Sequence, residues 1–335
     1  MSLNNSDIDF VLLWVDSSDV EWQKKKAAYI PRRNADVSAA RYRNWDNLRY
    51  WFRAVAKYAP WVRTIHFVTD GQVPVWLNTN NPCLHCVNHG DYIPQDALPT
   101  FNSSAIEISM HRIPGLADKF VFFNDDMFLT APITPDFYFH DDLPVDMAGL
   151  TRPCIPQPGK VFGNIMYNDY QILNRHFDKR LVLRCNMTKW LKPSYGKTLI
   201  RTLVNLNRST FDGLVIPHLS VPYRRSDLER VWNLYGKELQ DTMYHRFREE
   251  TDLNHFLFRF WRLCEGDFYP RRSRGYYIAL KNPTSVKVAA QIIRNRKKPE
   301  VCINDDWQTG DFEVARDTIN RAFDYVLTEK CKYEI

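Results

Sequence analysis

The strongest constraint on how this chain can fold is a series of short apolar runs, each closed by polar or turn-forming residues. Such runs are typical of buried strands. Four runs have this form: residues 8–15 (IDFVLLWV), 64–69 (TIHFVT), 84–88 (LHCVN) and 119–123 (KFVFF). Apolar residues at helical spacing in 47–58 and a second helical segment at 103–112 separate them. Strands that alternate with helices predict an α/β fold with a mostly parallel sheet.

Acidic residues follow three of the four predicted strands. They are Asp16 and Asp19 after the first, Asp70 after the second, and Asp125 with Asp126 after the fourth. Ligands of such sheets bind beyond the carboxyl ends of the strands. Two adjacent carboxylates repel each other unless a cation offsets their charge. The pattern therefore indicates a divalent metal with a diphosphate, or else acids that cap a strand and face water.

Composition indicates a folded protein with a weakly basic surface. The chain has 335 residues, of which 44% are hydrophobic, and a net charge of +6. This charge suits phosphate-bearing small molecules or an anionic membrane, and since no basic aromatic motif is present we expect no nucleic-acid partner. Without an 18-residue apolar run or a signal-peptide start, the expected location is the cytoplasm. The basic run at 294–298 is a candidate contact with the inner membrane face.

Six longer stretches resemble, in order, conserved regions of the Stealth family. They are residues 8–22 (IDFVLLWVDSSDVEW), 41–77, 98–129, 216–232 (IPHLSVPYRRSDLERVW), 246–254 (RFREETDLN) and 302–307 (CINDDW). The family includes bacterial capsular-polysaccharide sugar-1-phosphate transferases and the catalytic subunit of lysosomal-enzyme N-acetylglucosamine-1-phosphotransferase. The resemblance implies an α/β, Rossmann-like core similar to that of the GT-A glycosyltransferases, with an additional helical C-terminal part.

The resemblance also implies a domain plan and a reaction. A single catalytic domain over residues 1–335 would comprise a nucleotide-sugar-binding core (8–150), a variable acceptor-side insertion (151–215) and a C-terminal part that completes the site (216–330). The implied reaction moves a sugar-1-phosphate, N-acetylglucosamine-1-phosphate being the expected group, from a UDP-sugar to a hydroxyl of a capsular or exopolysaccharide acceptor. UMP leaves. Such phosphoryl transfer requires in-line positioning, cations around the phosphate and a base.

By this resemblance the expected catalytic residues are His218, Arg248 and Asp125. His218 would take the acceptor proton or donate to a phosphate oxygen, and Arg248 would face the transferring phosphate. We expect His218 at the end of a strand. The alternative to its catalytic role is that His218 is a structural histidine whose hydrogen bonds are satisfied within the protein. Arg248 and Asp252 are four residues apart, so a simple ion pair on one face of a helix is the alternative there.

The residues expected to bind the nucleotide-sugar come from several of the matching stretches. They are Trp14, Asp16, Asp19, Arg41, Arg43, Arg49, Asp70 and Asn124. The ring of Trp14 would hold uridine, with core packing as the alternative. The arginines would grip the diphosphate bidentately. Ser17 stands where the family often has glycine, so a positive φ at this position would strain the loop.

A second Asn-Asp-Asp triplet completes the expected metal site. Asp126, Asn304, Asp305 and Asp306 are expected ligands of Mg²⁺ or Mn²⁺, because both ions prefer oxygen ligands. Asp125 or Asp126 could instead act as the base. Two other functions stay open: a metal-dependent GT-A glycosyltransferase that releases UDP, and a catalytically silent nucleotide-sugar-binding protein.

Overall fold

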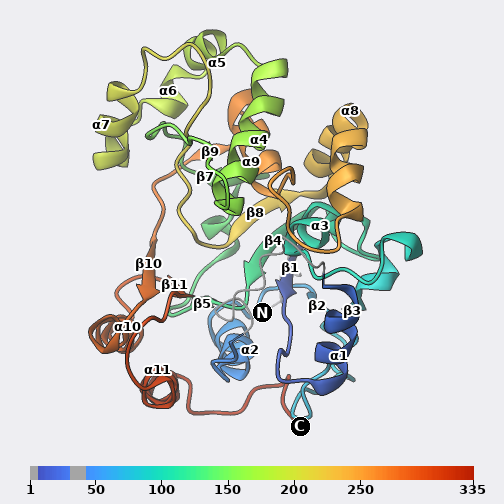
Figure 1. Cartoon of the computed structure of the whole chain (residues 1–335). Coiled ribbons are helices and arrows are strands. Elements are labelled where there is room, and N and C mark those ends of the chain that lie inside the picture. The colour runs from blue at the N-terminus through green and yellow to red at the C-terminus, as the bar shows by residue number, and fades with distance from the viewer. Residues whose placement is uncertain (1–6, 31–42) are drawn as a thin grey trace.

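A computed structural model describes residues 7–30 and 43–335 of the chain (Figure 1). Its centre is a five-stranded sheet. In spatial order the strands are β3 (Leu84–Asn88), β2 (Ile65–Thr69), β1 (Ile8–Leu13), β4 (Lys119–Asn124) and β8 (Val221–Arg224). The first four run parallel, and β8 is antiparallel to β4. The predicted α/β fold with a mostly parallel sheet is therefore confirmed, although β1 ends two residues before the predicted end.

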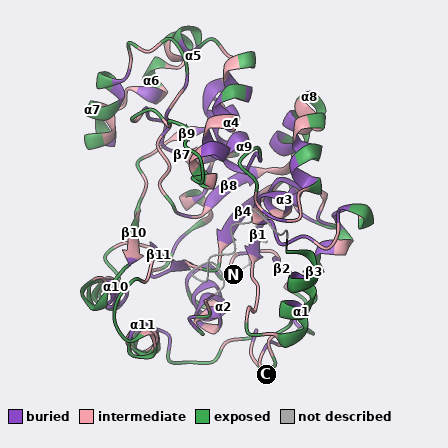
Figure 2. Ribbon diagram, in the orientation of Figure 1, coloured by how far each residue is buried: buried purple, intermediate pink, exposed green. Residues whose placement is uncertain are grey.

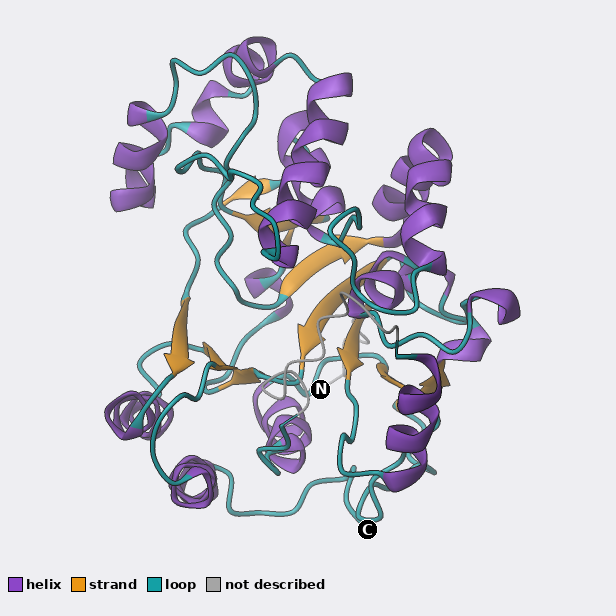
Figure 3. Ribbon diagram, in the orientation of Figure 1, coloured by secondary structure: helices purple, strands orange, loops and turns teal. Residues whose placement is uncertain are grey.

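Both faces of the central sheet are buried beneath helices, which explains why its strands are apolar throughout. Phe10 and Leu12 of β1 pack in the core that includes α2, whereas Val11, which points the other way, packs in the core that includes α9. Figure 3 shows helices on either side of the sheet. The helices are α1 (Val20–Tyr29), α2 (Leu48–Tyr58), α3 (Ser103–Ile108), α4 (Val161–His176), α5 (Lys179–Cys185), α6 (Met187–Trp190), α7 (Lys197–Val204), α8 (Arg225–Tyr244), α9 (Phe256–Glu265), α10 (Pro283–Asn295) and α11 (Phe312–Val326).

A smaller sheet joins the C-terminal part of the chain to the core. It contains β10 (Gly275–Leu280), β11 (Glu300–Asp305) and β5 (Met127–Leu129). β5 follows β4 after a two-residue turn and pairs antiparallel with β11. In addition, the backbone N–H of Ile303 donates to the carbonyl of Asp126 at 2.9 Å. This pairing brings two segments that are far apart in sequence into direct contact.

Two expectations need adjustment. Of the helix predicted for 103–112, only α3 is α-helical, and a 3₁₀ turn (Met110–Arg112) follows it. His218 was expected at the end of a strand, but it lies in the loop that precedes β8. Among the described residues, no helix has the length and apolar character needed to cross a bilayer.

A buried ion network anchors α9 to a third sheet, formed by β6 (Phe139–His140), β7 (Leu143–Asp146) and β9 (Tyr269–Pro270). Asp146 accepts hydrogen bonds from Arg259 at 2.7 Å and from Arg262 at 2.9 Å, and all three side chains are buried. Burial raises the pKa of Asp146, but the two arginines outweigh it and hold that pKa below its ordinary value. Because a buried charge without a partner is costly, each member depends on the others.

The substitution Asp146→Asn should lower the free energy of unfolding by about 3–5 kcal/mol at neutral pH, because Arg259 and Arg262 stay buried without a counter-charge. Urea denaturation measures this change. Asp142→Asn is the matched control: its exposed pair with Lys119 should contribute less than about 1 kcal/mol.

The same substitution has an expected pH dependence. A carboxylate whose folded-state pKa is depressed contributes stability above its ordinary pKa and loses that contribution as the pH falls through the lowered value. The stability difference between wild type and Asp146→Asn should therefore shrink in acid. Equal costs for the Asp146 and Asp142 substitutions would contradict this view of the network.

Candidate active site

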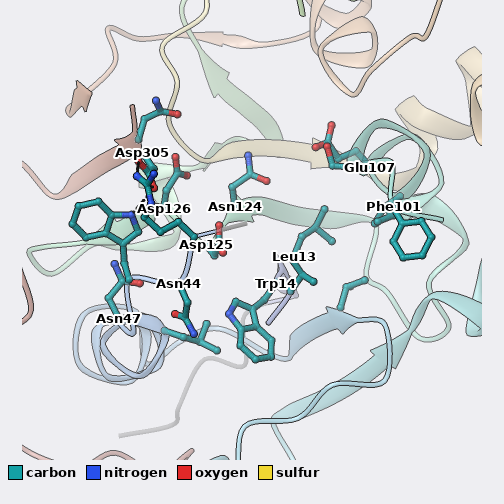
Figure 4. A pocket seen from close by; sticks show the side chains of 18 of the residues that line it. Leu13, Trp14, Asn44, Asn47, Phe101, Glu107, Asn124, Asp125, Asp126 and Asp305 are labelled. Atoms are coloured by element: carbon teal, nitrogen blue, oxygen red, sulfur yellow. Dashed lines mark hydrogen bonds and ion pairs between the residues drawn. The ribbon is translucent and has the colours of Figure 1, made fainter. Parts of the chain in front are cut away.

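A cavity of about 520 Å³ opens at the C-terminal ends of β1 and β4. Figure 4 shows its walls: Trp14 and Asn44 on one side, Asp126 and Asp305 on a second, and Glu107 with Phe101 at the far end. The wall residues come from β1, β2, β4, β11, α1, α2, α3 and the loops between them. A cavity of this size at the carboxyl edge of a parallel sheet is the expected place for a ligand.

The turn between β4 and β5 carries the two adjacent acids of the cavity. Asp125 is exposed to the cavity, and the surrounding protein together with the negative charge of Asp126 raises the pKa of Asp125 to about 7. Asp126 lies deeper, where burial raises its pKa as well. Two carboxylates forced together in this way store electrostatic repulsion that a bound cation would relieve.

The surroundings of Asp126 fit a hard metal ion. Its Oδ2 accepts a hydrogen bond from Sγ of Cys302 at 3.3 Å, whereas its Oδ1 is buried and has no hydrogen-bond partner among the described residues. Asn304 lines the same cavity and offers an amide oxygen. Within residues 7–30 and 43–335, no group of three or more His, Cys, Asp or Glu side chains is arranged so that it could hold a metal ion by itself. A metal here would therefore depend on mixed carboxylate, amide and substrate oxygens, which Mg²⁺ accepts.

The second triplet is brought to the cavity by β11, but its members differ in their surroundings. Asp305 accepts hydrogen bonds from Arg43 at 2.8 Å and from Trp45 at 3.0 Å, so both of its oxygens are engaged. Asp306 lies outside the cavity lining and pairs with Lys281 at 3.3 Å. The structure therefore brings Asn304 to Asp126, while Asp305 holds Arg43 at the cavity wall.

Aromatic side chains form a wall of the cavity beside Asn124. Trp14 follows β1 and stacks one face on Phe67 of β2, with ring centroids 5.6 Å apart. Trp22 and Phe101 add two more rings to the lining. Trp14 is thus packed against the core on one face while it also lines the cavity, so both of its expected roles are compatible with its position.

Arg248 reaches the cavity from a loop rather than from a helix. Its guanidinium contacts the hydroxyl of Ser103 and lies 4.0 Å from Glu107. The alternative, a surface ion pair with Asp252, is wrong: Asp252 is fully buried and accepts hydrogen bonds from His245 at 2.6 Å and from Asn102 at 2.8 Å. These bonds fix the loop that presents Arg248.

His218 does not line the main cavity but a small second pocket, together with Arg259, Arg272 and Glu300. Its backbone has φ of 51°, and its exposed ring packs against Tyr277 with centroids 4.8 Å apart. Partial desolvation and the charge of Arg259 lower the pKa of His218, which favours the neutral imidazole. A neutral imidazole can accept a proton.

Tyr277 of β10 contacts the ring of His218, although sequence reasoning did not single it out. It pairs in register with Cys302, whose Sγ bonds Asp126. Burial and the charges of Cys302 and Asp126 raise the pKa of Tyr277. Tyr277 therefore contacts His218 and lies opposite the strand residue that bonds Asp126.

The other predicted nucleotide-sugar residues that the structure describes lie outside the lining of the cavity. Asp19 caps α1 by accepting from the backbone of Glu21 at 2.9 Å, and Asp16 accepts from the Ser18 hydroxyl at 2.6 Å. The others are Asp70, which pairs with Lys25 at 2.7 Å, and Arg49, which lies over the ring of Trp76. Arg41 falls outside the described residues. Ser17 has no positive φ, so the expected strain does not arise.

Two lining residues carry chemistry that sequence reasoning missed. Glu107 of α3 is buried within reach of both Arg248 and His255. His89 is buried, its Nδ1 has no hydrogen-bond partner among the described residues, and burial lowers its pKa to about 4. Glu107 lies in the predicted helix at 103–112 and His89 directly follows the predicted strand at 84–88, but isolated Glu and His residues look the same in sequence whether they face a core or a cavity.

Comparisons with known proteins identify relatives of this chain. The model "Stealth protein CR1, conserved region 1" matches residues 6–33, and "Stealth protein CR2, conserved region 2" matches residues 41–146. The capsular polysaccharide phosphotransferase WcwK of Streptococcus pneumoniae is 37% identical over 99% of this chain and 99% of its own length. The exopolysaccharide phosphotransferase cps2G of Lactiplantibacillus plantarum is 37% identical over 98% of this chain and 96% of its own.

Solved structures show a more distant likeness. Mouse xyloside xylosyltransferase 1 superposes with a TM-score of 0.37 and 10% identity, covering 89% of this chain and 98% of its own. The galactosyltransferase LgtC, solved with donor and acceptor sugar analogs, gives a TM-score of 0.37 and 10% identity over 95% of this chain and 96% of its own.

The two matched regions include the parts of the chain that build the cavity. The first contains β1 with Trp14, and the second contains β4 with Asp125 and Asp126. The full-length relatives extend the match over the C-terminal part as well. This chain therefore belongs to the Stealth family, and it is a phosphotransferase.

Proposed function

We propose that the protein transfers a sugar-1-phosphate from a UDP-sugar, with UDP-N-acetylglucosamine as the first candidate, to a hydroxyl of a polysaccharide acceptor. The acceptor oxygen attacks the phosphorus that bears the sugar, and the bond from this phosphorus to UMP breaks. The bond between sugar C1 and its oxygen stays intact. The relatives' names support the acceptor class, since they are capsular, exopolysaccharide and receptor polysaccharide phosphotransferases.

The observation that carries this proposal is the meeting of opposite charges in one cavity. The acids Asp125 and Asp126 line it together with the cation Arg248 and an aromatic wall that includes Trp14. A nucleoside diphosphate needs these surroundings: a ring to stack its base, and cations to balance its phosphates. A divalent cation bound together with the diphosphate would offset the charge of the acid pair.

The residues of the chain divide between the two substrates. Arg248, which the Ser103 contact holds in place, would face the transferring phosphate and stabilise the charge that develops there. His218 lies in the neighbouring pocket, where its neutral ring would accept the proton of the acceptor hydroxyl. Asp125 could serve as an alternative proton acceptor because it faces the cavity.

Asp126 and Asn304 would hold a Mg²⁺ or Mn²⁺ ion. The unpartnered Oδ1 of Asp126 supports this assignment. The engaged oxygens of Asp305 favour a positioning role through Arg43 instead. When bound, such an ion neutralises phosphate oxygens and makes the nucleotide a better leaving group.

The identity of the released nucleotide tests the reaction. Incubation with UDP-sugars, Mg²⁺ and an oligosaccharide acceptor should release UMP, measured by chromatography. UDP as the main product would mean attack at the sugar carbon and would overturn the proposal in favour of a glycosyltransferase. No nucleotide from any donor, with any acceptor, would favour the silent binding protein.

Arg248→Gln should lower kcat on the order of 10³-fold with a smaller change in KM, because its charge acts mainly on the transition state. Arg246→Gln is the matched control. Arg246 bonds the Leu98 carbonyl at 3.1 Å and does not line the cavity, so near-normal turnover is expected. If both variants lose activity equally, the role of Arg248 is structural.

Asp126→Asn should weaken Mn²⁺ binding by about tenfold or more, since a carboxylate ligand becomes a neutral amide. Electron paramagnetic resonance of free Mn²⁺ measures this without reference to activity. Asp306→Asn should change the Mn²⁺ affinity by less than about twofold, because Asp306 is outside the cavity. The reverse order would mean that Asp306, rather than Asp126, holds the metal.

A further inference from the structure

Two stretches of the chain contain many basic residues and no acidic ones. Residues 179–211 have eight: Lys179, Arg180, Arg184, Lys189, Lys192, Lys197, Arg201 and Arg208. Residues 271–298 have nine: Arg271, Arg272, Arg274, Lys281, Lys287, Arg294, Arg296, Lys297 and Lys298. Outside them acidic residues outnumber basic ones, so the positive net charge of the protein is concentrated in these two segments.

The two basic segments meet at the start of α7. A Cβ placed on Gly196, the residue before this helix, would lie 3.7 Å from Nη1 of Arg272. Nearby, Nζ of Lys192 donates to the carbonyl of Pro270 at 3.0 Å. Arg272 of the second segment therefore lies beside the start of α7 in the first.

α7 also exposes aliphatic side chains to solvent. The exposed fractions are 64% for Ile200, 49% for Leu203 and 76% for Val204. Lys197 and Arg201 lie beside them, and positions 197, 200, 201 and 204 share one side of a helix. Figure 2 shows α7 as a largely exposed helix at the outer edge of the molecule. We call these five residues the α7 face.

We propose that the α7 face docks on an anionic lipid bilayer. Aliphatic side chains flanked by Lys and Arg are the composition of helices that lie in the membrane interface, where apolar groups enter the acyl boundary and cations meet lipid phosphates. A soluble polyanion would use the cations but not Ile200, Leu203 and Val204. A second copy of the chain would bring the same positive charge to the contact and be repelled.

This placement has a consequence for catalysis. Arg272 adjoins Gly196 and also lines the pocket of His218. Docking through the α7 face would therefore hold the mouth of this pocket next to the bilayer surface. That position suits an acceptor that is itself carried by a lipid. It also differs from the contact that the sequence suggested, the basic run at 294–298.

Vesicle flotation of the full chain tests the apolar part of the contact. Wild type should float with phosphatidylcholine vesicles that contain phosphatidylglycerol and not with phosphatidylcholine alone. Ile200→Ser/Val204→Ser should reduce the bound fraction about tenfold. Val288→Ser/Val314→Ser is the matched control, since these valines are 43% and 61% exposed on α10 and α11. All four side chains are partly or mostly in solvent, so thermal melting should be unchanged.

The charged part is tested with Lys197→Gln/Arg201→Gln against Arg294→Gln/Lys297→Gln. Each pair removes two positive charges, but only the first removes them from the α7 face. The first should weaken binding about tenfold more than the second at low salt, and 1 M salt should weaken wild-type binding strongly. A larger loss in the second pair would overturn the proposal in favour of the 294–298 run.

Other results would also overturn it. If the wild-type protein fails to float with anionic vesicles at low salt, the proposal is wrong. If the Ile200→Ser/Val204→Ser variant instead differs from wild type in the mass measured by light scattering, a second copy of the chain covers the α7 face. Both readouts are independent of nucleotide release, so the membrane proposal and the proposed reaction can fail separately.

Discussion

The pairing of β5 with β11 is the constraint on which the site depends. It places the turn of Asp125 and Asp126 beside Asn304, although about 180 residues separate the two triplets in the sequence. Backbone hydrogen bonds, such as that from Ile303 to Asp126, fix this geometry without engaging the carboxylate of Asp126. The fold thus confines two acids in one turn and leaves Oδ1 of Asp126 buried without a hydrogen-bond partner among the described residues, and a bound cation or protonation would offset the repulsion.

Buried polar networks support the rest of the site. The loop of Arg248 depends on Asp252, which bonds His245 on the same loop and Asn102 at the N-terminus of α3. Because α3 also supplies Glu107, one network positions a cation and an acid of the same cavity. Such a network costs stability if any member is lost, but it fixes side chains that would otherwise sample several rotamers.

The site has two compartments, and their separation suits a reaction with two substrates. The main cavity holds the acids and the aromatic wall, and the smaller pocket holds His218. Tyr277 contacts the ring of His218 and pairs in register with Cys302. A donor in the first compartment and an acceptor in the second would meet near this tyrosine. The neighbouring basic surface adds a reason for the second compartment to face a membrane.

The sequence by itself determined the α/β fold, the strands and the acid pair at the end of β4, because burial on both faces requires continuous apolar runs and function requires acids at their ends. The division of the chain at 150 and 215 stays a prediction. Only the tertiary structure decided which polar residues share the cavity: it excludes Asp70 and Asp306, assigns His218 to a neighbouring pocket, and adds Glu107. The reason is that side-chain direction at a strand end depends on loop geometry and on pairing between distant segments, which local patterns do not encode.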